Sequence, residues 1–197
     1  MDSTESAICG GIAARTYGRV EQCLSSGNIS VTGQSVYAGN IFGRSEVTSD
    51  ARSIYFGVAN ACMGTGNIVV TGGGEQSCVG GVGGFVQAGT LDTSYLGGGA
   101  TNCLFTGEIR GEFSYCGSII GACAEIIYDR NYFSFNGVGY VNFEGNYYLA
   151  SSMSSIGAAI STDGTFRSVT GKGGAEAAYD DIKKTETYLT LAELFGL

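Results

Sequence analysis

The chain has 197 residues, with 34 glycines and no proline, histidine or tryptophan. The absence of histidine excludes a Ser-His-Asp triad, a Cys-His pair and imidazole-ligated zinc, and an apolar content of 44% with only 14% charged residues argues against disorder. Ten basic against eighteen acidic residues give a net charge of −8. Because binding to nucleic acids or anionic membranes needs clustered basic residues, we expect neither as a partner.

Neither a membrane-spanning segment nor a targeting segment is visible in the sequence. The longest apolar runs fall far below the ~18 residues that a membrane helix requires. The first residues, MDSTESAICGG, lack the basic start and the apolar stretch of a secretory signal peptide. We therefore expect no membrane insertion, and a secreted location would require that the chain is a mature form or an excised piece.

One short element occurs four times along the chain. Each copy reads as two small or apolar residues, a glycine, a small or polar residue and then a β-branched residue. The copies are AICGGIAA (7–14), VYAGNIFG (36–43), CVGGVGGF (78–85) and YCGSIIGA (115–122). Their anchoring glycines, which follow one another at steps of 29, 41 and 37 residues, are Gly10, Gly39, Gly80 and Gly117.

A second element lies between the copies of the first. It reads CLSSGNISVTG, CMGTGNIVVTG and CLFTGEIRG, and its first residues are Cys23, Cys62 and Cys103. A degenerate fourth copy, VNFEGNYY at 141–148, keeps the Gly-Asn step but has lost the cysteine. The interval from the anchoring glycine to this cysteine is 13, 23 and 23 residues, as expected of conserved cores joined by tolerant loops.

Each element has the pattern of a short strand that ends at a corner. Ile29 and Val31 alternate with polar residues, which is the two-residue period of a half-buried strand. The preceding Gly27-Asn28 tolerates the left-handed backbone that a tight corner demands. One such unit cannot bury its apolar face alone, so the sequence predicts an all-β, parallel β-solenoid of stacked repeats. An antiparallel sandwich is the main alternative.

The two elements together resemble the GLUG repeats of bacterial surface proteins, which are named for a Gly-Leu-apolar-Gly core. The resemblance covers about Ala7 to Tyr148. Asparagine usually precedes the cysteine of such repeats but does so here only at Cys103, and the usual leucine is replaced by Ile12, Ile41, Val82 and Ile119. The resemblance implies a module of large secreted, cell-surface or adhesin-like proteins, in which the repeats act as spacers or binding surfaces and carry no catalytic residues.

Seven cysteines follow the repeats. Equivalent positions of a solenoid stack into a ladder, in which cysteine acts as a small hydrophobe. Disulfides and a metal cluster are the alternatives, but the count is odd, no CxxC occurs and no histidine assists. We expect buried thiols, which would suit an anaerobic or otherwise reducing habitat. The seven are Cys9, Cys23, Cys62, Cys78, Cys103, Cys116 and Cys123.

Motifs for nucleotides and metals are incomplete, so the sequence predicts no cofactor and no metal. The stretch GGVGGF fails the G-x-G-x-x-G pattern, since Val86 stands where the third glycine is needed. The GGxGxD calcium repeat is absent. Carboxylates in loops or connections are the remaining acid-base groups, and a β-helix lyase or glycosidase could use a pair of them. They are Asp50, Asp92, Glu125, Asp129 and Glu144.

Aromatic residues concentrate between positions 128 and 148. An exposed strip of them could stack on sugar rings or anchor a protein partner. Alternatively, this last repeat is bulky because it packs beneath a C-terminal cap. The candidate ligand or partner surface comprises Tyr128, Tyr132, Tyr140, Tyr147 and Tyr148. If the strip binds a glycan or a partner, replacing Tyr132 and Tyr140 with Ala should abolish binding without loss of folding.

The composition changes after residue 170, so we divide the chain into glycine-rich repeats (1–170) and a charged connection with a capping helix (171–197). Thr190-Leu-Ala-Glu193 reads as a capping box, and Gly196 is placed as a stop. We expect a short amphipathic helix that covers the open end of the solenoid. No comparable cap precedes the first repeat, so the chain either continues upstream or adds to another copy.

These observations favour a non-enzymatic structural or adhesive module of a bacterial surface or secreted protein, located outside the cell or on its surface. Its partner would be a protein or a glycan at a cell surface. The first alternative is a self-assembling subunit of an extracellular filament, which associates end to end. A carbohydrate-active β-helix enzyme is the second.

Overall fold

The computed structural model describes most of the chain up to residue 125 and shorter segments beyond it. The described residues are 6–49, 54–91, 94–125, 129–130, 133–134, 142–144, 147–149, 156–160, 166–167, 175–177, 181 and 183–197. Within them strands dominate, most strand pairs are parallel, and a short helix lies near the C-terminus. The prediction of an all-β fold with parallel pairing is confirmed, and the antiparallel alternative is excluded.

Five sheets contain most of the strands. Sheet A consists of β1 (Ser6–Gly10), β6 (Ser35–Gly39), β13 (Cys78–Gly80) and β19 (Tyr115–Gly117). Sheet B consists of β2 (Ala13–Thr16), β7 (Phe42–Ser45), β14 (Gly83–Leu91), β20 (Ile120–Glu125) and β25 (Ile156–Ile160), with β15 (Ser94–Gly97) and β26 (Phe166–Arg167) added antiparallel. Sheet C consists of β3 (Arg19–Glu21), β10 (Val58–Asn60), β16 (Gly99–Thr101) and β23 (Asn142–Glu144). Sheet D consists of β4 (Leu24–Ser25), β11 (Met63–Gly64), β17 (Leu104–Phe105), β24 (Tyr147–Leu149) and β27 (Ala175–Ala177), and sheet E of β5 (Ile29–Thr32), β12 (Ile68–Thr71) and β18 (Ile109–Gly111).

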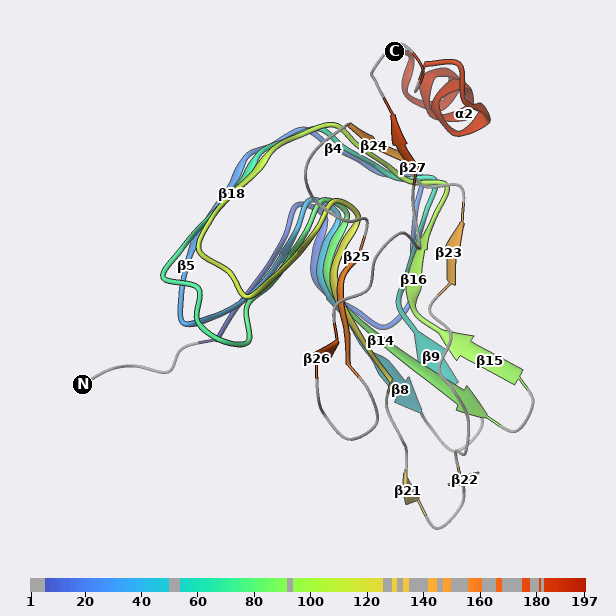
Figure 1. The fold of residues 1–197 in the computed structure, drawn as a ribbon. Helices are drawn as coiled ribbons and strands as arrows, with labels where there is room; N and C mark the ends of the chain where they lie inside the picture. The colour runs from blue at the N-terminus through green and yellow to red at the C-terminus, as the bar shows by residue number, and fades with distance from the viewer. Residues whose placement is uncertain are drawn as a thin grey trace.

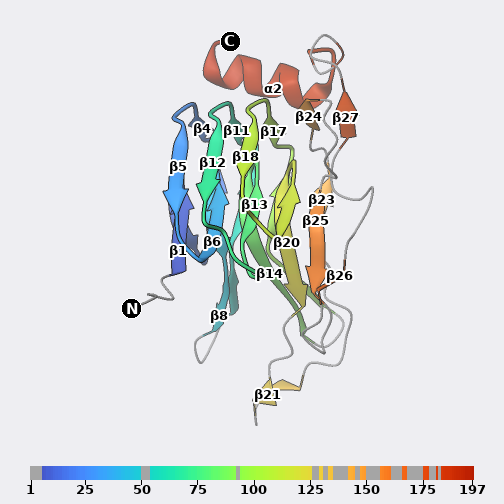
Figure 2. The same cartoon turned by 60° about the vertical axis from the view of Figure 1, so that its left-hand side comes forward.

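Between β1 and β18 the chain passes three times through these sheets in one order, from A through B, C and D to E. A fourth passage runs from β19 in sheet A to β24 in sheet D, after which β25 joins sheet B and β27 joins sheet D. We call one such passage a circuit. Circuit 1 runs from β1 to β5, circuit 2 from β6 to β12, circuit 3 from β13 to β18, and circuit 4 from β19 to β24. The circuits superimpose when viewed along the stack (Figure 1), and from the side β5, β12 and β18 lie next to one another (Figure 2).

In-register pairing places equivalent residues of successive circuits beside one another. In sheet E, Ile68 pairs with Ile29 on one side and with Ile109 on the other. The anchoring glycines form one row of sheet A, in the order Gly10, Gly39, Gly80 and Gly117. Each copy of the repeated elements therefore builds the same corner of a different circuit.

Glycine is needed where sheets A and B approach each other closely. A Cβ at Gly84 of β14 would lie 2.5 Å from the backbone nitrogen of Ala38, and one at Gly43 would lie 2.8 Å from that of Cys9. Since glycine alone lacks this atom, the backbones can meet at these positions only if the residue is glycine. The apex at which the two sheets meet is visible near the centre of Figure 1.

Apolar rows fill the space that the sheets surround. Val36 of sheet A, Ala59 of sheet C and Ile68 of sheet E are fully buried and belong to one cluster. Across this interior a glycine faces a larger side chain, so that the two together fill the available volume. The pairs are Gly11 with Ser25, Gly64 with Asn40, and Gly81 with Phe105. Circuits with the same backbone thus reach the same packing with different side chains.

Polar residues also stack at the corner before sheet E. Asn28 Oδ1 accepts a hydrogen bond from the backbone nitrogen of Asn67 (2.9 Å), and Asn67 Oδ1 accepts one from that of Glu108 (2.9 Å). The Gly-Asn or Gly-Glu step of the second element therefore has a structural reason. An asparagine in one circuit satisfies the backbone of the next.

Hairpins inserted between sheets B and C explain the unequal spacing of the repeat. Circuit 2 inserts β8 (Val47–Ser49) and β9 (Ile54–Phe56), and circuit 3 extends β14 and pairs it with β15. A further hairpin, β21 (Asp129–Arg130) with β22 (Phe133–Ser134), lies in circuit 4. Circuit 1 passes from β2 to β3 without one, which is why its glycine-to-cysteine interval is 13 rather than 23 residues.

Helix α2 (Glu186–Phe195) begins earlier than the sequence pattern indicates. Its N-cap is Thr185, whose side chain accepts a hydrogen bond from the backbone nitrogen of Tyr188 (3.2 Å). Thr190 and Glu193 lie inside the helix, so the predicted start was wrong. The predicted end is confirmed, because Gly196 stops the helix in a left-handed conformation with φ 68°.

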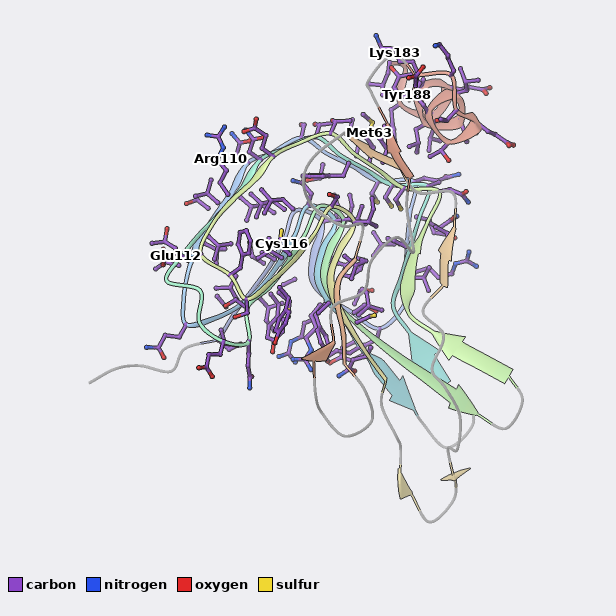
Figure 3. The ribbon with its side chains drawn as sticks, viewed as in Figure 1. Met63, Arg110, Glu112, Cys116, Lys183 and Tyr188 are labelled. Carbon is purple, nitrogen blue, oxygen red and sulfur yellow. The ribbon has the colours of Figure 1, made fainter. Side chains whose placement is uncertain are left out.

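The helix lies along the side of the stack, and the expectation that it covers an end was wrong. Leu191 is fully buried against Met63 and Leu104, which belong to sheet D of circuits 2 and 3. Figure 2 shows α2 crossing the strands of sheet D, and Figure 3 shows Met63 on the side of the sheet that faces the helix and Tyr188. The ten residues of α2 span about 15 Å, or about three strand spacings. The apolar side of the helix therefore contacts the row of sheet D that contains Met63 and Leu104, rather than the end of the stack.

Circuit 1 is the outermost circuit at one end of the described stack. Each of its five strands is the terminal strand of its sheet. Ile12 is 44% exposed, whereas Ile41, Val82 and Ile119 of the same row are fully buried. Leu24 of β4 is 38% exposed for a different reason, because it lies on the outward face of sheet D, in register with Met63, and does not belong to the cluster that Met63 and Leu104 form with α2. Among the described residues, the core of the stack is therefore uncovered at this end.

Candidate functional site

Arginine and aromatic side chains gather in the angle between sheets A and B. Arg15 and Arg44 pair in register on β2 and β7. The guanidinium carbon of Arg44 lies 5.2 Å from the ring centroid of Tyr37 and 5.1 Å from that of Phe85. The two rings meet edge to face, with centroids 5.5 Å apart. A half-buried guanidinium is thus held against two aromatic rings, an arrangement in which cation–π attraction is favourable.

Glu46 ties the two arginines together. Its Oε1 lies 2.7 Å from Arg44 Nε and 3.6 Å from Arg15 Nη1, and its Oε2 accepts a hydrogen bond from the Tyr17 hydroxyl (2.6 Å). One carboxylate thus faces two guanidiniums, of which the side chain of Arg15 is 51% exposed. We call these residues the arginine–tyrosine patch, consisting of Arg15, Tyr17, Tyr37, Arg44 and Glu46. Tyrosine and arginine are the side chains that most often dominate binding energy at interfaces.

A column of thiols lies on the opposite side of the interior. Cys23, Cys62 and Cys103 immediately precede Leu24, Met63 and Leu104, which pair in register in sheet D. Each sulfur donates to the carbonyl oxygen two residues before it, at 3.2 Å for Cys23, 3.3 Å for Cys62 and 3.2 Å for Cys103. We call these three residues the thiol column. Its members share one side-chain orientation, so their sulfurs follow one another along the stack.

The residue before each of these cysteines has a left-handed backbone. Gln22, Ala61 and Asn102 have φ values of 54°, 51° and 52°. Asparagine is the non-glycine residue that tolerates this conformation best, because its short polar side chain can form a local hydrogen bond. Alanine has no such group to offset the strain. This is the physical reason why asparagine before the cysteine suits the repeat, and it marks Ala61 as a strained position.

Burial controls the acidity of the thiols. It raises the pKa of Cys78 and of Cys116 to about 12, and that of Cys123 to about 11. Within the thiol column, burial raises the pKa of Cys103, whereas the hydrogen bond with the Cys103 thiol lowers the pKa of Cys62. Cys62 is therefore the member of the column that loses its proton most easily.

A polar cleft of about 390 Å³ separates the beginning of α2 from sheets C and D. Its lining residues are Asn60, Ala61, Asn102, Glu186, Thr187, Thr190 and Leu191. The Asn102 side chain donates to Asn60 Oδ1 (3.3 Å), and the Thr101 hydroxyl donates to the same oxygen (2.9 Å). The amides are thus engaged with each other across neighbouring circuits.

The candidate aromatic strip falls mostly outside the described residues, which include neither Tyr128, Tyr132 nor Tyr140. Tyr147 and Tyr148 lie in β24, where they pair with Leu104 and Phe105. The candidate carboxylates also fall largely outside the described side chains. Asp50 and Asp92 are outside the described residues, and the backbones of Glu125, Asp129 and Glu144 belong to β20, β21 and β23. Among the described residues, no group of three acidic or cysteine side chains is placed to hold a metal ion.

The sequence reasoning missed the arginine–tyrosine patch. Arg15 and Arg44 both lie five residues after an anchoring glycine, so an alignment of the first two copies would have revealed them. The third copy has Phe85 at this place, so the arginine does not recur in every copy of the element. The contact of Arg44 with Tyr37 depends on the angle between sheets A and B, which no local pattern encodes.

Comparison with protein-family models, with curated proteins and with solved structures finds no match to this chain. The resemblance to GLUG repeats therefore stays a prediction. In the part of the chain that the structure describes, no helix has the length and apolar character needed to cross a membrane.

Proposed function

We propose that the chain is a parallel β-solenoid that serves as a non-enzymatic structural and adhesive module of a bacterial surface or secreted protein. The observation that carries this proposal is the repetition of one five-sheet order, in register, through circuits 1, 2 and 3. Such an array creates a long lateral surface and a continuous core, which suits the presentation of a binding face rather than the enclosure of a substrate.

Spin labels test the solenoid directly. Ser30 pairs with Val69, and Val69 with Arg110, so the first and last of these exposed positions are two strands apart. Labels at Ser30 and Arg110 should lie about 10 Å apart and broaden each other's spectrum. Doubly labelled protein that shows no dipolar broadening would contradict the stacking.

The arginine–tyrosine patch supports the adhesive role. It combines exposed and half-buried Tyr and Arg side chains with an ion-pair network that fixes their positions before a partner arrives. The positive charge left by two arginines facing one glutamate suits an acidic glycan or an acidic protein segment. The tyrosine strip at positions 128–148 is the second candidate surface for the same role.

Paired variants distinguish these two surfaces. Wild-type protein is screened against immobilised acidic and neutral glycans, and binding is then measured for Arg15→Ala/Tyr17→Ala and for Tyr132→Ala/Tyr140→Ala. The pair on the binding surface should weaken affinity at least tenfold, which is about 1.4 kcal/mol. Val69→Ala, an exposed change on sheet E, is the control. Unchanged affinity in both pairs would reject both surfaces.

End-to-end self-association is the second candidate function, and the uncovered first circuit favours it. Ile12 exposes apolar surface that its equivalents in later circuits, Ile41, Val82 and Ile119, bury in the core. Light scattering over a hundredfold concentration range should then show a growing mass, which Ile12→Lys should abolish. Val69→Lys introduces the same charge at a similarly exposed position (40% against 44%) on the lateral face and should leave assembly intact. A constant monomer mass in the wild type would exclude the filament.

A further inference from the structure

The thiol column brings three cysteines into contact across three successive circuits. The backbone nitrogen of Met63 donates to the carbonyl of Cys23 (2.8 Å), and that of Leu104 donates to the carbonyl of Cys62 (3.0 Å). Adjacent in-register residues of parallel strands are separated by one strand spacing, about 4.8 Å. That separation lies within the roughly 4.4–6.8 Å range of Cα distances that a disulfide spans.

The side chains have the orientation that such a bond requires. All three sulfurs turn toward the carbonyl oxygen two residues earlier, and Cys62 Sγ also reaches down to the carbonyl oxygen of Val20 in circuit 1 (3.3 Å). Cys62 precedes Met63, which pairs in register with Leu24 on one side and with Leu104 on the other, so Cys62 lies between Cys23 and Cys103 along the stack. The central sulfur therefore has one sulfur neighbour on each side along the stack.

Exposure falls along the column from its outer to its inner members. Cys23 belongs to the outermost circuit and is half-buried, whereas Cys62 and Cys103 are fully buried. A small oxidant in solution therefore reaches Cys23 first. No disulfide joins any of the seven cysteines in the structure, all of which lie in the described part of the chain.

We propose that the thiol column is an oxidation site, at which a peroxide converts Cys23 and Cys62 into a disulfide that staples circuit 1 to circuit 2. Peroxide oxidises the Cys23 thiol to a sulfenic acid and leaves as water. The Cys62 sulfur then attacks the Cys23 sulfur, the S–O bond breaks, and the oxygen leaves as a second water with the thiol proton of Cys62. Two electrons pass from the two sulfurs to the peroxide.

The third cysteine allows the disulfide to move inward. The Cys103 sulfur lies behind Cys62, on the side away from Cys23, which is the direction from which a thiolate attacks a disulfide sulfur. Its attack forms the Cys62–Cys103 bond and returns Cys23 to a thiol that carries the proton of Cys103. The exchange consumes no oxidant, and it leaves the reachable thiol ready for a second encounter. This site is independent of whether the module is adhesive or filamentous.

The other cysteines provide an internal control. Cys9 and Cys116 also share one row, in sheet A, but Ala38 and Val79 stand between them. Three strand spacings, about 14 Å, separate their Cα atoms, which no disulfide spans. Oxidation should therefore be confined to the thiol column, although Cys9 is half-buried like Cys23.

The test uses the reduced 197-residue chain and equimolar hydrogen peroxide. After quenching and unfolding, the number of reactive thiols should fall from seven to five, and the mass should fall by two hydrogen atoms. Cleavage after Glu21, Glu46 and Glu75 places Cys23 and Cys62 on separate peptides, and fragmentation of the peptide that carries both Cys78 and Cys103 distinguishes a bond to Cys103 from one to Cys78 by mass spectrometry. A disulfide that joins Cys62 to Cys23 or to Cys103 is the expected product.

Variants show whether the column itself is responsible. Cys62→Ser removes the central sulfur and should leave no disulfide, whereas Cys116→Ser should oxidise as the wild type does. Should Cys62→Ser not fold, as judged by circular dichroism, Cys103→Ser keeps the test intact, because only the Cys23–Cys62 bond can then form. The proposal is overturned by sulfinic acid at Cys23 without a disulfide, by a bond to any cysteine outside the column, or by a dimer linked through Cys23.

Discussion

Size compensation across the interior makes a sharp prediction for the pair Asn40 and Gly64. A Cβ at Gly64 would lie 2.8 Å from the Asn40 Cβ, closer than two such atoms pack. Circuit 1 has the reverse arrangement. Ser25 pairs in register with Gly64, and Gly11 is the equivalent of Asn40, because each follows one of the paired glycines Gly10 and Gly39. The double variant Asn40→Gly/Gly64→Ser therefore gives circuit 2 the interior pair of circuit 1.

Each single change should destabilise the protein for a different reason. Gly64→Ser overfills the interior, which costs about 1–3 kcal/mol. Asn40→Gly removes the hydrogen bond from Asn40 Nδ2 to the carbonyl of Gly66 (2.6 Å) and opens a cavity, at about 1–3 kcal/mol. Asn40 Oδ1 has no hydrogen-bond partner among the described residues, so its loss offsets part of this cost.

The double variant should be more stable than the sum of the singles implies, by about 1–2 kcal/mol. Urea unfolding of the four proteins, followed by far-ultraviolet circular dichroism, measures this coupling. Gly27→Ser is the control, because a Cβ there meets no atom within 4 Å, and it should change stability by less than about 0.5 kcal/mol. A coupling energy of zero would show that the two positions do not compensate each other.

Three further predictions concern the corner, the helix and the thiols. Ala61→Gly should raise the free energy of unfolding by about 1 kcal/mol, because glycine adopts the φ of 51° without strain. Ala59→Gly in the adjacent strand should lower it, and the urea midpoints of the two variants test the difference. Thr185→Ala should weaken α2 by about 1 kcal/mol and speed hydrogen exchange of its amides about fivefold. Thiols of the unfolded chain ionise near pH 9.0, whereas burial raises the pKa of Cys78 to about 12. Between these values the folded state binds one more proton than the unfolded state. The free energy of unfolding should therefore fall by about 1.4 kcal/mol per pH unit above pH 9 because of this thiol. Unfolding midpoints in Cys78→Ala should depend less on pH, and equal slopes in both proteins would contradict this assignment.

Local patterns sufficed to predict the repeated parts of the fold. The alternation around Ile29 specifies a short strand, and its recurrence specifies parallel stacking, because equivalent residues can bury their apolar faces only against each other. The expectation of a left-handed backbone at Gly27-Asn28 was wrong, since the left-handed residues in these circuits include Gln22, Ala61 and Asn102 instead. The same reasoning predicted loops of variable length between the cores, and in the structure several of these insertions form hairpins. Gly196 was a reliable stop, since a left-handed residue after an apolar stripe has few other uses.

Features that depend on contact between distant segments were not predictable in this way. The start of α2 was misplaced because two threonines, Thr185 and Thr190, both precede apolar residues, and only the docking of Leu191 on sheet D decides between them. Its position along the side of the stack follows from the outward face of Met63 and Leu104, which in sequence look like any other apolar pair. The arginine–tyrosine patch likewise exists only because sheets A and B meet at an angle.

The row that carries the patch also restricts where a partner can bind. It reads Arg15, Arg44, Phe85 and Ala122 from circuit 1 to circuit 4, so its charge is confined to the first two circuits. Both this charge and the exposed Ile12 therefore lie at the same end of the stack. A second copy seated on circuit 1 would cover Ile12 and approach Arg15, so that Ile12→Lys and Arg15→Ala would weaken one and the same assembly. A glycan bound along the patch would respond to Arg15→Ala but not to Ile12→Lys, and the two variants together therefore separate the adhesive from the filamentous function.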